Sequence, residues 1–221
     1  DKDTSRGLGD VYKRQDITMF MSDMNLNENL SSTPQDRREL MDLVERMQGA
    51  FTTIAKSKIP TIALAHGFCI GGATSLVSAC DIRLATKDAK FSIGETKLGL
   101  VADVGVIQRM PKIVSSGDMN ELALTGRIFD GEHAEKIRFV SKAYGNSDEL
   151  FEAGEKLANE ISSNSKRIVQ ATKEALEKSS NLTVDQGLEY AKLWSTSFLV
   201  SEDLREGVMA FLEKRDPKFN E

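Results

Sequence analysis

Two adjacent glycines, Gly71 and Gly72, separate two apolar runs and are followed by small side chains that carry no charge. A strand that turns sharply into a helix needs backbone conformations that a Cβ atom disfavours. Such a turn leaves the first helical N–H groups unpaired, and with the helix dipole they favour a nearby negative charge. The pair therefore indicates a candidate site for a negative charge that develops on an oxygen. The alternative is that both glycines only let a strand and a helix pack closely.

Two carboxylates follow in the segment SIGETKLGLVADVG. Glu95 comes after a short predicted strand, and Asp103 is surrounded by leucine and valine residues. An apolar setting disfavours the charged form of a carboxylate and raises its pKa toward values useful in acid–base catalysis. We therefore expect Asp103 to be partly desolvated. The alternatives are that Glu95 is a solvated loop acid and that Asp103 caps the helix that follows it.

Composition excludes several classes of protein. The chain has 221 residues and a net charge of −5, whereas a nucleic-acid binder usually has a basic face. No apolar run approaches the roughly 18 residues of a membrane span, and we expect no signal peptide. Cys69 and Cys80 lack a CxxC spacing and predict reduced thiols in an intracellular protein, cytoplasmic or organellar. The two histidines, His66 and His133, are not part of a ligand cluster, so we expect no metal site.

Strands and helices alternate over residues 16–146, which predicts an α/β domain that positions these side chains. A helix is expected to begin at Thr33 and Pro34 and to end at Pro60. The run TIALAHGFCI predicts one buried strand before the two glycines, and DIRLAT and KFSI predict two more. Residues 147–221 predict an all-helical region, and residues 1–15 are interpreted as a foreign or irregular leader.

The sequence from Lys58 to Lys112 resembles the crotonase superfamily, the enoyl-CoA hydratase/isomerase fold. Its glycine-rich turn, its Cys-Asp-Ile strand, the acid before Leu-Gly and the QRMP motif match the family pattern, and the likeness extends from about Asp16 to Lys218. The resemblance implies a spiral of ββα units, N-terminally truncated here, with a helical C-terminal region. It also implies an acyl-CoA thioester substrate, no separate cofactor, and assembly as a homotrimer or a dimer of trimers.

The same resemblance assigns the residues of the thioester site. The carbonyl oxygen would lie between the backbone N–H groups of Gly72 and Gln15. Residues in contact with the substrate would be Asp16, Ile17, Thr18, Gly71 and Ser75. Family members carry further strands before the position of Asp16, so we expect that the natural N-terminal part is missing.

Hydratases of this family hold a water between two glutamates, at the positions of Ser75 and Glu95. A serine hydroxyl stays protonated at neutral pH unless a base activates it, so we expect poor hydration. The VADVG motif instead resembles Δ3,5-Δ2,4-dienoyl-CoA isomerases, in which acids at the positions of Glu95 and Asp103 move a proton from C2 to C6. That branch usually has an aspartate at the position of Ser75.

The resemblance thus implies an isomerase of enoyl-CoA or dienoyl-CoA double bonds, with Glu95 acting at C2 and Asp103 at the distal carbon. One alternative is an enoyl-CoA hydratase or enoyl-CoA isomerase of fatty-acid β-oxidation. A second alternative, from another class, is a non-catalytic member that binds acyl-CoA or associates with RNA. The acidic composition counts against RNA.

Overall fold

The computed structural model describes residues 33–219, which divide into two compact units. The first unit contains residues 33–56 and 61–151, and the second contains residues 57–60 and 152–219. Within this described part, every strand belongs to the first unit, and the elements of the second unit are helices. The predicted α/β part and the predicted helical C-terminal region are therefore both present.

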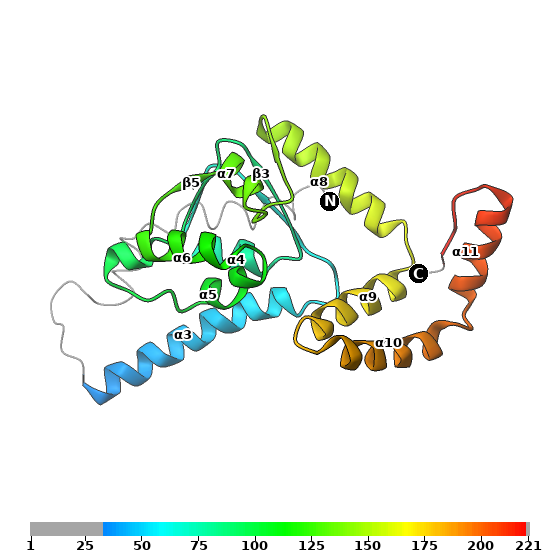
Figure 1. The fold of residues 1–221 in the computed structure, drawn as a ribbon, viewed down its shortest axis with the longest axis horizontal. Coiled ribbons are helices and arrows are strands. Elements are labelled where there is room, and N and C mark those ends of the chain that lie inside the picture. The colour runs from blue at the N-terminus through cyan, green and yellow to red at the C-terminus, as the bar shows by residue number, and fades with distance from the viewer. Residues whose placement is uncertain (1–32, 220–221) are drawn as a thin grey trace. The chain divides into compact units, whose positions relative to one another are not determined.

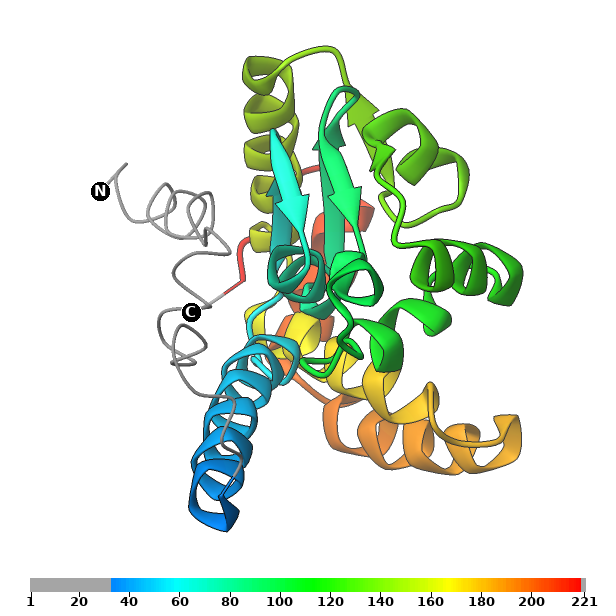
Figure 2. The same cartoon turned by 90° about the vertical axis from the view of Figure 1, so that its left-hand side faces the viewer.

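The strands of the first unit form two small sheets, whose paired strands run side by side in Figure 2. One sheet has the order β1-β3-β6 and is parallel. The other has the order β2-β4-β5, in which β4 is parallel to β2 and antiparallel to β5. Strands β1 to β4 thus alternate between the sheets, as expected for a spiral of ββα units. The bounds are β1 Ile62–Ala65, β2 Phe68–Ile70, β3 Ile82–Thr86, β4 Lys90–Ser92, β5 Phe129–Asp130 and β6 Lys142–Tyr144.

Helices α4 and α7 of the first unit pack against its strands (Figure 1). Helix α3 packs against α4, and α4 packs against α5. Two short 3-10 helices, η1 and η2, connect these elements. The bounds are α3 Pro34–Ala55, α4 Gly72–Ala79, η1 Gly94–Leu98, α5 Val106–Arg109, η2 Met110–Lys112, α6 Ser116–Thr125 and α7 Gly131–Lys136. Helix α8 (Ser147–Ser162) begins in this unit and continues in the second.

The predicted start of the first helix is confirmed. The Thr33 hydroxyl accepts the N–H of Asp36, whose carboxylate accepts the N–H of Thr33, and Pro34 occupies the first turn. The predicted end is wrong, because α3 stops at Ala55 rather than at Pro60. The Ser57 hydroxyl accepts the N–H of Ile59 and so helps to shape the connection to the first strand.

The prediction of one strand over TIALAHGFCI is also wrong, because the chain turns at residues 66–67 and forms β1 and β2. The two strands belong to different sheets, so the chain must leave one sheet to enter the other. The expected burial on both faces fails as well, since Phe68 is 71% exposed while Cys69 beside it is buried.

Three phenylalanine rings lie at the centre of the first unit. Phe91 on β4 stacks on Phe129 of β5 and meets Phe139 edge to face, each at 5.5 Å between centroids. The Thr74 hydroxyl of α4 lies near the backbone oxygens of Cys69 and Ser92 and donates between them. This contact fixes the first turn of α4 against β2 and the end of β4.

The second unit contains α9 (Lys166–Ser179), α10 (Val184–Phe198) and α11 (Glu202–Glu213), of which α9 and α10 pack together (Figure 1). Helix α10 begins with a capping box, because Thr183 and Gln186 exchange side-chain and backbone hydrogen bonds. The Ser201 hydroxyl caps α11 by accepting the N–H of Leu204. The Ser165 hydroxyl, at the start of α9, donates to Asp203 at 2.7 Å and ties α9 to α11.

Candidate active site

The turn between β2 and α4 has the conformation that the two glycines predicted. Gly71 has φ of 57° and ψ of −116°, a combination that residues with a Cβ atom rarely adopt. Its N–H donates to the backbone oxygen of Ser92 at 3.0 Å, which joins the turn to the end of β4. A Cβ atom on Gly71 would lie 3.5 Å from Oε1 of Glu95. The glycine turn and the Glu95 carboxylate are therefore neighbours.

Helix α4 begins at Gly72, immediately after this turn. The first turn of a helix has N–H groups without intrahelical acceptors, and the described part of the chain gives the Gly72 N–H no other acceptor. The helix dipole adds positive potential at this end. The arrangement can hold a negatively charged oxygen, as an oxyanion-hole donor does, although the assignment of Gly72 to that role stays a prediction.

Glu95 lies in η1 and its side chain is half-buried. Its Oε2 atom is buried and has no hydrogen-bond partner among the described residues. Burial raises the pKa of the Glu95 carboxyl, and the nearby charge of Asp103 adds to that increase. The interpretation of Glu95 as a solvated loop acid is therefore wrong.

Asp103 does not have the apolar environment that its neighbours in sequence predicted. Ala102 and Val104 are buried, whereas the Asp103 side chain between them is exposed. The buried neighbours pack inward while the carboxylate faces outward, so the apolar neighbours do not cover it. The prediction that Asp103 is desolvated is therefore wrong. The interpretation of Asp103 as a helix cap is also wrong, since α5 has Gly105 at its N-cap and no side-chain cap bond.

Ser75 is fully buried in α4, and its hydroxyl has no hydrogen-bond partner among the described residues. The other buried hydroxyls of this helix differ, because Thr74 donates to strand carbonyls and Ser78 donates to the backbone oxygen of Ser75. Side chains on a helix lean toward its N-terminus, so Ser75 lies on the same side of α4 as Gly71, four residues earlier. The hydroxyl is thus unpaired close to the glycine turn.

The remaining predicted site residues, Gln15, Asp16, Ile17 and Thr18, lie outside the described residues. In the range 33–219, no group of histidine, cysteine and acidic side chains could hold a metal ion. Within the same range, no helix has both the length and the apolar character needed to cross a membrane.

Cys69 and His66 have structural environments. Burial raises the pKa of the Cys69 thiol to about 12, so the thiol stays protonated and behaves as a core side chain. The His66 ring meets Phe151 edge to face at 5.7 Å between centroids. Both environments are typical of structural residues.

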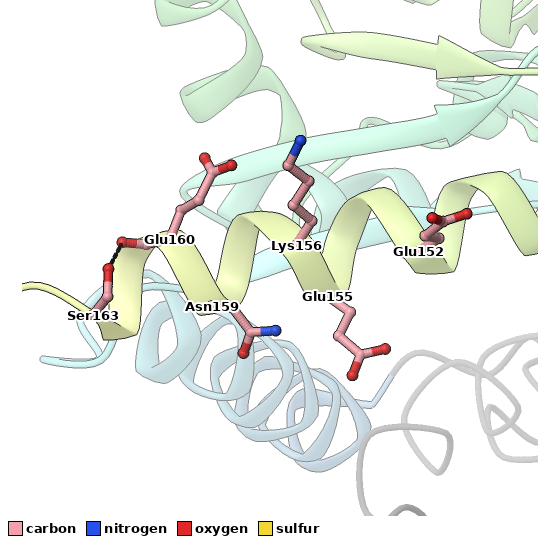
Figure 3. Close-up of a pocket in the computed structure, with 6 residues that line it drawn as sticks. All are labelled: Glu152, Glu155, Lys156, Asn159, Glu160 and Ser163. Atoms are coloured by element: carbon pink, nitrogen blue, oxygen red, sulfur yellow. Dashed lines mark hydrogen bonds between the residues drawn. The ribbon is translucent and has the colours of Figure 1, made fainter. Parts of the chain in front are cut away.

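Two surface pockets among the described residues do not contain the predicted site residues. One has a volume of about 570 Å³ and follows a polar face of α8, where Ser163 donates to the backbone oxygen of Glu160 (Figure 3). Its lining is Glu152, Glu155, Lys156, Asn159, Glu160 and Ser163. The other has a volume of about 420 Å³ and is lined by Lys90, Arg127, Ile128, Phe129, Asp130 and His133. Exposed charged side chains of this kind are ordinary solvated surface.

Sequence reasoning missed the residues that hold the Asp103 loop. Gln48 on α3 donates to the backbone oxygen of Asp103 at 2.6 Å. Arg109 donates to Thr52 of α3 at 3.1 Å and lies 3.4 Å from the backbone oxygen of Val104. The QRMP motif marked Arg109 as a family-like residue, but no sequence signal indicated Gln48 or Thr52.

Comparison with known proteins places this geometry in a family. The sequence profile described as enoyl-CoA hydratase/isomerase matches residues 18–221. The chain belongs to this family. Among its relatives in the enoyl-CoA hydratase/isomerase family are two proteins named Δ(3,5)-Δ(2,4)-dienoyl-CoA isomerase. The mitochondrial one from Dictyostelium discoideum is 46% identical and aligns with 85% of this chain and 64% of its own length. The peroxisomal one from Arabidopsis thaliana is 41% identical and aligns with 90% of this chain and 75% of its own length.

Solved structures of the enoyl-CoA hydratase/isomerase family share the fold. An enoyl-CoA hydratase from Bacillus anthracis matches with a TM-score of 0.78 at 27% identity, covering 88% of this chain and 74% of that one. DspI from Pseudomonas aeruginosa matches with a TM-score of 0.79 at 28% identity. The match covers 88% of this chain and 73% of the DspI chain. The predicted crotonase fold class is therefore confirmed, while the chain spans 64% of the length of the Dictyostelium relative.

Proposed function

We propose that this protein isomerises double bonds of enoyl-CoA and dienoyl-CoA thioesters, with Glu95 and Asp103 as its acid–base pair. The observation that carries the proposal is the half-buried Glu95 carboxyl, which has an unpaired oxygen and lies beside the Gly71 turn. A raised pKa brings a carboxylate closer to the range in which a general base works best near neutral pH. The two relatives named as dienoyl-CoA isomerases support this choice within the family.

The proposed reaction moves one proton along the acyl chain. The Glu95 carboxylate takes a proton from C2, and the electron pair delocalises over the thioester carbonyl and the adjacent double bonds. The Gly72 N–H, with that of Gln15 as the second donor implied by the family resemblance, stabilises the enolate oxygen. A proton passed from solvent through the Asp103 carboxyl then reaches C6, so the double bonds shift from positions 3 and 5 to positions 2 and 4. Exchange with solvent restores both carboxyl groups.

Ser75 favours isomerisation over water addition. Hydration requires a base that activates water, and the Ser75 hydroxyl cannot act as one at neutral pH without a partner that removes its proton. We propose that Ser75 and Gly71 contact the substrate together with Asp16, Ile17 and Thr18. Coenzyme A enters as part of the substrate, and the proposed chemistry uses no separate cofactor or metal.

The test compares purified protein and its Asp103→Asn variant on 3,5-dienoyl-CoA, 3-enoyl-CoA and 2-enoyl-CoA. We expect the protein to convert the dienoyl substrate, and we expect Asp103→Asn to lose that conversion. Removal of a positioned acid or base costs about 10²–10⁴-fold in rate. Full dienoyl isomerisation by Asp103→Asn would refute the role of Asp103.

Two alternatives have distinct outcomes in the same assays. Conversion of 2-enoyl-CoA or 3-enoyl-CoA without conversion of the dienoyl substrate would identify a hydratase or enoyl isomerase of fatty-acid β-oxidation. Binding of acyl-CoA in calorimetry with no turnover of any of these substrates would identify a non-catalytic member.

A homotrimer or a dimer of trimers is the assembly that we propose from the family resemblance. Helix α11 supports self-association, because it exposes five large apolar side chains, Leu204, Val208, Met209, Phe211 and Leu212. Light scattering of the purified protein would give the mass directly, and a monomer at micromolar concentration would contradict this assembly. A cytoplasmic location stays a prediction, and the relatives named mitochondrial and peroxisomal favour the organellar alternative.

A further inference from the structure

Two consecutive carbonyl groups connect the loop that carries Asp103 to α3, one directly and one through Arg109 of α5. The backbone oxygen of Asp103 accepts a hydrogen bond from Gln48 at 2.6 Å. The backbone oxygen of Val104 lies 3.4 Å from Nη1 of Arg109, whose Nη2 donates to the Thr52 hydroxyl at 3.1 Å. Gln48 and Thr52 are four residues apart and therefore lie on one side of α3. The helix thus holds the two consecutive peptide groups that follow Asp103, the first directly through Gln48 and the second through Arg109.

Packing holds the loop at the same place. The Val104 side chain is 4% exposed and lies in a small apolar cluster with Phe51 of α3 and Ala79 of α4. Helix α4 begins at Gly72, so the cluster connects the Asp103 loop to the helix that carries the proposed oxyanion donor. The position of Asp103 relative to Gly72 is therefore determined through α3 and α4 rather than by the loop alone.

Gly105 provides the space for Arg109. Its φ is 116°, and a Cβ atom at this position would lie 1.8 Å from Nη1 of Arg109. Any other residue would therefore displace the guanidinium from the Val104 carbonyl. In the described part of the chain, Arg109 is in no ion pair, so its contacts with the loop are hydrogen bonds to neutral groups. Its effect on Asp103 would be exerted through the backbone position.

We propose that Gln48, Thr52 and Arg109 are positioning residues that hold Asp103 where it can protonate the distal carbon of the acyl chain. This inference rests on the proposed function, because it assigns these residues a role only through Asp103. An exposed carboxylate on a free loop would sample many positions, and a misplacement of about 1 Å can cost about 100-fold in rate. The Gln48 hydrogen bond and the bridge from Val104 through Arg109 to Thr52 restrict that freedom without burying the carboxylate.

The experiment separates the step at C2 from the step at the distal carbon. Exchange of the C2 proton of a 3,5-dienoyl-CoA with D2O reports Glu95, whereas formation of the 2,4-dienoyl product also requires Asp103. We expect Thr52→Val and Gln48→Leu each to reduce product formation by about tenfold, with C2 exchange and KM unchanged. Matched controls on α3 are Thr53→Val, whose hydroxyl bonds its own helix, and Gln35→Leu, whose amide bonds Glu39. We expect both controls to match the unaltered protein.

The double variant Thr52→Val with Asp103→Asn completes the test. If Thr52 acts through Asp103, the double variant has the activity of Asp103→Asn alone. Equal losses of C2 exchange and product formation in Thr52→Val would overturn the inference, because they would indicate a general structural effect. Normal activity of Thr52→Val and Gln48→Leu, together with an inactive Asp103→Asn, would overturn the positioning role alone. An active Asp103→Asn would instead overturn the proposed function and the inference with it.

Discussion

Replacement of Glu95 by glutamine should remove the proposed activity and at the same time stabilise the protein. The carboxylate is half-buried, its Oε2 atom has no partner, and burial raises its pKa. A raised pKa in the folded state means that folding favours the protonated form. The associated stability is fully present below the pKa of the unfolded chain and is lost as pH rises through the raised pKa.

The size of the effect follows from the unpaired oxygen. A buried polar group without a partner costs about 1–3 kcal/mol, and a glutamine amide retains part of that cost while removing the charge. We therefore expect Glu95→Gln to increase the free energy of unfolding by about 1 kcal/mol at pH 8, or about 3 °C in Tm for a domain of this size. At pH 4 the two proteins should be nearly equal, because the carboxyl is protonated in both states.

Calorimetric unfolding at several pH values between 4 and 8 measures this difference. Glu155→Gln is a suitable control, since Glu155 is an exposed residue of α8. A difference for Glu95→Gln that stays constant with pH would refute the reasoning. So would a native protein that gains stability over the variant as pH rises.

Three further predictions concern the same region. Gly71→Ala should lower the free energy of unfolding by about 1–3 kcal/mol in urea titration, because φ of 57° disfavours a residue with a Cβ atom; an unchanged midpoint would contradict the strained turn. Ser75→Ala should raise the free energy of unfolding by about 1 kcal/mol, whereas Thr74→Val should lower it by about 1–3 kcal/mol, because only the Thr74 hydroxyl has a partner. Cys69 should resist alkylation at pH 8, because a pKa of about 12 leaves roughly one thiol in 10⁴ ionised; rapid labelling of the folded protein would show that its burial is wrong.

Sequence alone predicts the glycine turn because a backbone conformation with positive φ favours glycine at that position. Gly71 has positive φ, and no distant contact is required to recognise that two adjacent glycines before a small-residue helix permit it. Helix caps are predictable for the same reason, since Thr33 and Thr183 bond to backbone groups three residues away.

Which carboxylate is desolvated could not be predicted from its neighbours in sequence. Leucine and valine surround Asp103 along the chain, yet it is Glu95 that lies against the turn. Val104 is buried against α3 and α4, so Asp103 points away from that packing. This outcome depends on contacts across about 50 residues, which local composition does not encode.

The unpaired hydroxyl of Ser75 was equally beyond sequence analysis. Thr74, Ser75 and Ser78 are similar small hydroxyl residues on one short helix. The carbonyl groups that satisfy Thr74 come from β2 and from the end of β4, and they lie on one side of the helix only. The split of TIALAHGFCI into two strands has a comparable cause, because it depends on which strands later in the chain become the partners.

Because the strands pair in parallel, the number of residues between paired strands determines which side chains reach the candidate active site. Ile62 pairs with Ile82, and Phe68 pairs with Lys90, so one circuit of the spiral takes about twenty residues. A residue about one circuit after the glycine turn therefore lies next to that turn, as Glu95 does. A single-residue deletion between Asp81 and Phe91 would leave every proposed catalytic side chain in the protein. It would still rotate Glu95 or withdraw it from the turn. The number of residues between Gly71 and Glu95 is therefore as important for the proposed activity as the carboxylate itself.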